Sequence, residues 1–176
     1  MNVPAPLDLT AFIRDIPDFP KPGIVFKDIT PLLAHPVAFQ TAIQRLVDFY
    51  RPRQIDAVVA AEARGFIFAA PLAIALGVGF IPIRKPGKLP YRTQSLEYDL
   101  EYGSDKLEIH VDGVQAGQRV AVVDDLLATG GTMSACCQLL EGLGAIIDSC
   151  SFIVDLSFLG GAKLLAPREI HRLISY

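Results

Sequence analysis

The residues best suited to chemistry lie at positions 119–132, which read R-V-A-V-V-D-D-L-L-A-T-G-G-T. A short apolar run ends in two adjacent carboxylates, Asp124 and Asp125, and a turn of small and hydroxyl-bearing residues follows them. Carboxylates accept hydrogen bonds, so this pair suits the hydroxyls of a ribose. Gly130 and Gly131 tolerate the dihedral angles that aim backbone N–H groups at a phosphate. The stretch therefore predicts a binding site for a sugar phosphate.

The segment after this turn, residues 133–143, has helical composition. The N-terminus of a helix attracts an anion through its N–H groups and its dipole. A nucleoside triphosphate loop is excluded, because G-x-x-x-x-G-K-[ST] is absent and no lysine follows the glycines. A structural alternative stays open for the two acids, since carboxylates after a strand often only cap the next helix.

Strands that alternate with helices must position these residues. Apolar periodicity and the Pro and Gly residues predict helices at about 36–50, 65–76 and 132–143, and strands at 57–61, 80–83, 120–123 and 145–154. A short helix is also predicted, from Asp8 or Thr10 to about Asp15. Residues 16–29 are extended and rich in turns, and a final short strand or tail follows Pro167. The alternation predicts an α/β fold with a parallel sheet, in which ligands bind at the carboxyl ends of the strands. The A-E-A-R-G sequence at 61–65 and the D-D-L-L-A-T-G-G-T sequence both lie at that edge.

Residues 84–112 interrupt this rhythm. The segment opens with four basic residues and then alternates polar and apolar positions, which predicts an antiparallel hairpin turned at Gly103-Ser104. A charged excursion from an α/β core is typical of an active-site lid. The basic residues suit a small anionic ligand, although a solvated loop has the same composition; they are Arg84, Lys85, Lys88 and Arg92.

The length and charge limit the class of protein. A chain of 176 residues forms one domain with a core, and a net charge of −3 predicts no nucleic-acid partner. Residues 66–83 carry no charge, which is the length of a membrane span, but Pro71, Gly77, Gly79 and Pro82 interrupt them. We therefore expect a buried helix, a turn and a strand there, and no membrane partner. The N-terminal residues lack the pattern of a signal peptide, so we expect a cytoplasmic protein.

The cysteines and histidines predict no chemistry of their own. Cys136, Cys137 and Cys150 show no metal-ligand spacing and are expected to be buried small hydrophobic residues in a reducing compartment. The three histidines, His35, His110 and His171, have no spacing that relates them to a nucleophile.

Four sequence blocks carry a family resemblance. They are F-P-K-P-G-I-V-F-K-D-I-T-P-L-L at 19–33, A-E-A-R-G-F at 61–66, L-E-Y-G at 100–103 and D-D-L-L-A-T-G-G-T at 124–132. The last block resembles the phosphoribosyl diphosphate (PRPP) signature of type I phosphoribosyltransferases, and the first narrows the resemblance to the adenine branch of that family. The matches run in order from about Ile16 to Pro167.

The resemblance implies a fold and a reaction. The fold is a single domain over 1–176: a parallel-sheet core flanked by helices, an N-terminal hood at about 1–35 and a flexible hairpin lid at about 84–112. The reaction is a glycosyl transfer of purine salvage, in which adenine and PRPP give AMP and diphosphate. Magnesium is held mainly through PRPP, without a protein metal site, and the enzyme is a homodimer.

The resemblance also assigns the site residues. Asp124 and Asp125 contact the ribose hydroxyls, and the 5′-phosphate lies on Ala128, Thr129, Gly130, Gly131 and Thr132. Arg64 contacts the diphosphate beside a cis peptide bond at Glu62–Ala63, together with Arg84, Lys85 and Lys88. The adenine contacts are Val25, Phe26, Lys27 and Leu126. Tyr102 belongs to the lid, and Glu101 is the candidate for the carboxylate that takes the purine proton. A lid carboxylate is placed well for that transfer, although alternation alone makes Glu101 an exposed strand residue.

Two alternatives remain open from the sequence. An enzyme for another base, such as hypoxanthine, guanine, xanthine or orotate, would keep the signature and change the hood. A regulator that senses PRPP would keep the fold without catalysis, but the core leaves little of the chain for a further domain.

Overall fold

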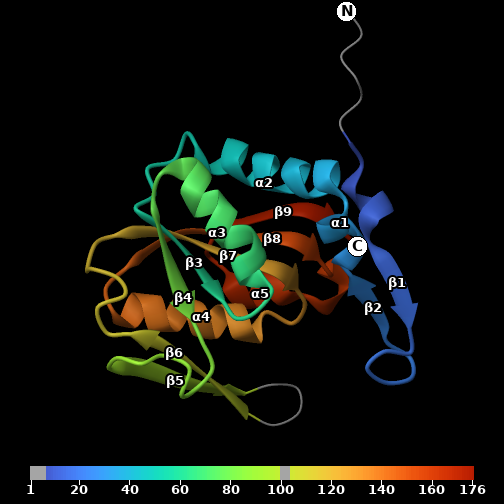
Figure 1. Ribbon diagram of the computed structural model, residues 1–176. Helices are drawn as coiled ribbons and strands as arrows, with labels where there is room; N and C mark the ends of the chain where they lie inside the picture. The colour runs from blue at the N-terminus through green and yellow to red at the C-terminus, as the bar shows by residue number, and fades with distance from the viewer. Residues whose placement is uncertain (1–6, 100–103) are drawn as a thin grey trace, which may run out of the picture. The chain divides into compact units, whose positions relative to one another are not determined.

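The computed structural model describes residues 7–99 and 104–176, and Figure 1 shows the chain. Residues up to Arg45 and residues from Leu46 onward form two compact units. Helix α2 (Pro36–Tyr50) crosses the boundary between the units and has the predicted bounds. The expectation of one domain over 1–176 stays a prediction.

The N-terminal unit consists of a short helical turn, a hairpin and helices. The 3₁₀ helix η1 (Leu9–Phe12) begins where the Asp8 carboxylate accepts a hydrogen bond from the N–H of Thr10, at 2.9 Å. Strands β1 (Arg14–Pro17) and β2 (Val25–Asp28) pair antiparallel, and helix α1 (Thr30–Ala34) follows. The predicted helix to about residue 15 was therefore wrong beyond Phe12. Arg14 and Asp15 belong to β1 instead, where ion pairs join them to β2. The guanidinium of Arg14 lies 2.7 Å from a carboxylate oxygen of Asp28, and Nζ of Lys27 lies 2.6 Å from a carboxylate oxygen of Asp15.

The C-terminal unit is built on the predicted parallel sheet. Its order is β4-β3-β7-β8-β9, with β3 (Ala57–Ala61), β4 (Gly79–Ile83), β7 (Arg119–Leu127), β8 (Ile146–Asp155) and β9 (Ile170–Ser175). Helices α3 (Gly65–Leu76) and α4 (Gly131–Gly142) cover opposite faces of it (Figure 1). Every residue of β3 is buried, as expected for a strand between two helical layers. The α/β fold class is confirmed, and the final segment is a strand.

Strand β7 is longer than the sequence predicted. Its pairing with β8 continues beyond Val123, since Asp124 faces Phe152 and Leu127 faces Asp155 in the register. The two carboxylates therefore lie within the strand. The hydrogen bonds between β7 and β8 involve backbone groups, so they tolerate polar side chains at the carboxyl end of the strand.

The segment after β4 forms the predicted hairpin. Strands β5 (Thr93–Asp99) and β6 (Ser104–His110) pair antiparallel in a two-stranded sheet. Ser104 already belongs to β6 and pairs with Asp99, so the turn predicted at Gly103-Ser104 does not include Ser104. Strand β5 packs along α4, and Leu107 and Ile109 of β6 are buried in the core. The hairpin is anchored to the helix that begins at the glycine turn.

The cysteines are buried, as the sequence predicted. Cys136, Cys137 and Cys150 are free and buried. In the described ranges 7–99 and 104–176, none of the helices is long and apolar enough to cross a membrane.

Candidate active site

A cavity of about 240 Å³ opens at the carboxyl edge of the parallel sheet. Two connections form its wall: residues 62–64, between β3 and α3, and residues 124–133, from the end of β7 into α4. The A-E-A-R-G and D-D-L-L-A-T-G-G-T sequences thus meet at one place, as the topology of a parallel sheet predicts. Most of the predicted site residues line this cavity: Arg64, Asp124, Asp125, Leu126, Ala128, Thr129, Gly130, Gly131 and Thr132.

The two carboxylates of β7 share a crowded and poorly solvated place. Asp125 is 4% exposed, and its backbone N–H donates a hydrogen bond to Oδ1 of Asp124 at 2.9 Å. Burial raises the pKa of Asp124 well above its ordinary value, and the neighbouring Asp125 carboxylate raises it further. Burial also raises the pKa of Asp125, although the guanidinium of Arg64 opposes this shift. The pair therefore holds protons more tightly than exposed acids do, as is common at functional sites.

Arg64 reaches the carboxylate pair from the other loop of the cavity wall, between β3 and α3. Its Nε lies 2.9 Å from Oδ2 of Asp125, while its side chain stays 44% exposed. The peptide bond between Glu62 and Ala63 is cis, as the resemblance implied. Gly65, at the beginning of α3, allows this approach: a Cβ there would lie 2.9 Å from Oδ1 of Asp124.

The turn between β7 and α4, residues 128–132, is termed the glycine loop here. Gly130 has a φ of +86°, a left-handed conformation that favours glycine, and stands at the N-cap of α4. Gly130 offers no capping side chain, so no cap competes with an anion for the N–H groups of the first turn. The hydroxyl of Tyr98, on β5, lies 3.3 Å from Oγ1 of Thr132. The hairpin thus contacts the glycine loop directly.

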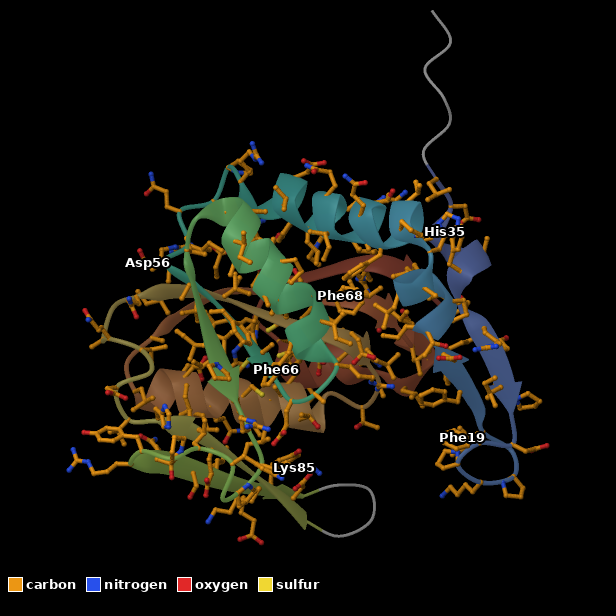
Figure 2. All side chains as sticks on the ribbon, in the orientation of Figure 1. Phe19, His35, Asp56, Phe66, Phe68 and Lys85 are labelled. Carbon is orange, nitrogen blue, oxygen red and sulfur yellow. The ribbon has the colours of Figure 1, made fainter. Side chains whose placement is uncertain are left out.

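The basic residues of the segment after β4, which are Arg84, Lys85 and Lys88, do not line the cavity. Figure 2 shows Lys85 on the chain that follows β4. Arg84 pairs with Glu62 at 2.9 Å, and Glu62 also accepts the backbone N–H of Lys85. Burial acts to raise the pKa of Glu62, but these two contacts outweigh it and hold the pKa below its usual range. Through Glu62, which lines the cavity, the segment is tied to its rim. Lys88 contributes its carbonyl oxygen to the guanidinium of Arg84, at 3.3 Å.

The three predicted adenine contacts of the N-terminal segment are not among the residues that line this cavity. Val25, Phe26 and Lys27 lie on β2 in the N-terminal unit. The Phe26 ring meets the ring of Phe19 edge to face, with centroids 5.2 Å apart. Glu101 and Tyr102 lie outside the described residues.

Leu127 and Met133 of the cavity wall were missed by sequence reasoning, and Glu62 and Ala63 were named only for the cis peptide bond beside Arg64. Their positions within the two loop motifs were the available signal. Tyr98 was also missed, because its contact with Thr132 depends on how the hairpin packs against α4.

Comparison with known proteins gives a consistent result. Residues 30–168 match the family model of the phosphoribosyl transferase domain. An adenine phosphoribosyltransferase of Rhodopirellula baltica is 56% identical over 170 residues, covering 97% of this chain and 82% of the relative. The crystal structure of the adenine phosphoribosyltransferase from Thermoanaerobacter pseudethanolicus is 56% identical, with a TM-score of 0.92 over 96% of this chain and 98% of that one. The Saccharomyces cerevisiae enzyme, solved with adenine and an imino-altritol bisphosphate, is 39% identical with a TM-score of 0.88, over 94% and 96% of the two chains.

Proposed function

The chain belongs to the adenine phosphoribosyltransferase family, and from this premise we propose how its residues transfer the phosphoribosyl group of PRPP to adenine. The reaction forms the bond between adenine and the anomeric carbon and releases diphosphate, so that AMP is the product. The observation that carries the residue assignments is the single cavity that joins Arg64, the two aspartates and the glycine loop.

The glycine loop is assigned to the 5′-phosphate. Backbone N–H groups at a helix N-terminus form a ready anion site, and Gly130 lets the backbone approach a ligand closely. Thr129 and Thr132 add hydroxyl donors on the same cavity wall. This loop would hold the sugar phosphate still while the anomeric carbon moves.

Asp124 and Asp125 are assigned to the ribose hydroxyls. Ionised carboxylates accept hydrogen bonds from a diol, and charge-assisted bonds of this kind are the stronger ones. Burial and the neighbouring Asp125 carboxylate disfavour the charged form of Asp124, and hydrogen bonds from the ribose hydroxyls would favour it.

Arg64 is assigned to the diphosphate, with Arg84, Lys85 and Lys88 as further cationic ligands. Fork-shaped guanidinium donors match phosphate oxygens. Diphosphate departs early, leaving a ribosyl centre with cationic character, so catalysis consists of positioning and of stabilising the departing anion. Closure of residues 84–112 would keep water from the cationic centre. Glu101 is the candidate for the base that takes the proton of adenine.

Magnesium fits this site only together with PRPP. Within the described residues, no group of three or more His, Cys, Asp or Glu side chains gathers as a metal site. Two adjacent carboxylates supply the oxygen donors that magnesium prefers, but too few of them for a complete shell. We propose that Asp124 and Asp125 hold the ion through the ribose hydroxyls of PRPP. The ion would supply charge neutralisation for the diphosphate.

The N-terminal unit is proposed as the base pocket. Phe26 would stack on the purine, the backbones of Val25 and Lys27 would read its hydrogen-bonding edge, and Leu126 would contact it from the cavity wall. A homodimer is also proposed. The outer side of α3 is apolar, and Ile74 is 82% exposed on it, which suits an interface. A cytoplasmic location remains the expectation of the sequence.

The assignment is tested by supplying PRPP and magnesium with adenine, hypoxanthine, guanine, xanthine or orotate in separate reactions. We expect nucleotide from adenine alone. Turnover of another base instead would keep the enzyme class and remove the adenine assignment. Binding of PRPP without nucleotide from any base would favour a regulator.

A further inference from the structure

A second glycine contacts the backbone of the glycine loop from outside the cavity. Gly161 begins helix α5 (Gly161–Leu165), and it is buried. A Cβ on Gly161 would lie 2.3 Å from the carbonyl oxygen of Ala128 and 3.1 Å from the backbone nitrogen of Gly130. The contact is reciprocal, since a Cβ on Gly130 would lie 2.8 Å from the carbonyl oxygen of Gly161. The two backbones therefore pack together with no room for a side chain between them.

Space alone explains glycine at position 161. Its φ does not lie in the left-handed region, whereas Gly130 and Gly160 have φ values of +86° and +72°. Alanine at the beginning of a helix would otherwise be favoured over glycine. The methyl group is excluded by the backbone of the glycine loop.

The segment that carries Gly161 is firmly held. Leu165 is fully buried, and the N–H of Lys163 donates to the carbonyl oxygen of Gly160 at 2.9 Å. Upstream, the hydroxyl of Ser157 donates to buried Asp155 at 2.8 Å, and the N–H of Ser157 donates to the carbonyl oxygen of Tyr176 at 3.0 Å. These contacts restrict movement of the segment that carries Gly161. A methyl group added at Gly161 would therefore displace the glycine loop.

We propose that Gly161 is a positioning residue for the phosphoribosyl transfer: its backbone acts as a stop that sets where the N–H groups of the glycine loop point. The proposal rests on the assignment of that loop to the 5′-phosphate. Restoring an ordinary contact to the Ala128 oxygen requires a shift of about 1 Å, and a misplacement of that size far from the reacting atoms can cost about a hundredfold in rate.

The test compares Gly161→Ala with Gly79→Ala and wild type. Gly79 also has an ordinary φ, and a Cβ there meets nothing within 4 Å, so it reports the effect of a methyl group without a clash. Dissociation constants are measured by calorimetry for ribose 5-phosphate and, separately, for inorganic diphosphate with magnesium. We expect Gly161→Ala to raise the dissociation constant of ribose 5-phosphate about tenfold or more and to raise the KM for PRPP. The dissociation constant of diphosphate should stay within about twofold of the wild-type value. Gly79→Ala should match wild type.

A second variant covers the case in which Gly161→Ala does not fold. Leu165→Ala loosens the support of α5 without adding an atom near the loop, and it should weaken ribose 5-phosphate more than diphosphate. Equal losses for both ligands in the folded variants, or no loss, would overturn the proposal. If wild type itself does not bind ribose 5-phosphate, the assignment of the glycine loop fails and the proposal with it. Normal wild-type binding with unchanged variants removes the role of Gly161 alone.

Discussion

The Nε atom of Arg64 lies 2.9 Å from the Oδ2 atom of Asp125. The cation assigned to the leaving group is thus paired with a carboxylate assigned to the ribose. The pair balances charge in the cavity and keeps two groups from different loops in contact. Substrate binding must redirect Arg64 toward the diphosphate, which its 44% exposure permits.

Replacement of Arg64 by lysine should weaken the binding of diphosphate selectively. Lysine keeps the charge but loses the fork of donors, and a hydrogen bond to a charged group contributes about 1.5–3 kcal/mol. We expect the dissociation constant of diphosphate with magnesium to rise about ten- to a hundredfold, while that of ribose 5-phosphate changes little. Calorimetry with both ligands measures this, with exposed Arg51→Lys as the control. An unchanged diphosphate affinity would remove Arg64 from the leaving-group site.

Replacement of Asp124 by asparagine should stabilise the empty protein at neutral pH. The pKa of Asp124 is raised in the folded state, so the folded state loses stability relative to the unfolded chain as the pH rises above about 3.9. Asparagine removes this loss and can still accept the N–H of Asp125. We expect Tm to rise by roughly 2–4 °C at pH 7, as about 1 kcal/mol gives in a chain of this size.

The same variant should show no gain at pH 3, where both states hold the proton. Thermal unfolding of wild type and variant at the two pH values measures the difference. A variant less stable than wild type at pH 7 would mean that the Asp124 carboxylate is not under strain.

Replacement of Phe26 by alanine should affect adenine and spare PRPP. Stacking of a base on an aromatic ring contributes about 1–3 kcal/mol, so the KM for adenine should rise about tenfold or more. Phe19→Ala is the matched control. The Phe19 ring contacts the Phe26 ring edge to face, and Phe19 is itself 51% exposed. Initial rates with each substrate varied in turn measure both constants. Equal effects of the two substitutions on adenine would argue against stacking on Phe26.

Much of the core could be predicted because its elements are bounded by strong local signals. Helices 36–50 and 65–76 have the expected bounds, since Pro36, Pro52 and Gly77 interrupt apolar stretches. Strand 57–61 was likewise recognisable as an apolar run buried on both faces. The family motifs placed the cavity, because two loops that follow parallel strands must meet at one edge of the sheet.

The features that escaped prediction depend on contacts between distant segments. The continuation of β7 past Val123 is enforced by pairing with β8, against the polarity of Asp124 and Asp125. The contact of Tyr98 with Thr132 depends on the packing of β5 along α4. The contact of Gly161 with the glycine loop could not be predicted, because the sequence Gly160-Gly161 indicates only a turn. The turn explains Gly160, which has a positive φ, and the contact explains Gly161.

The most direct measurement is the rate of AMP formation from adenine and PRPP by Asp125→Ala, beside wild type and the exposed control Asp112→Ala. Circular dichroism and thermal unfolding establish that each variant is folded. The removed carboxylate is assigned to the ribose and pairs with Arg64, so we expect turnover to fall by at least about a hundredfold, which corresponds to about 2.7 kcal/mol of transition-state stabilisation. The control should keep wild-type activity. Wild-type turnover by folded Asp125→Ala would contradict the assignment of this cavity as the site of phosphoribosyl transfer.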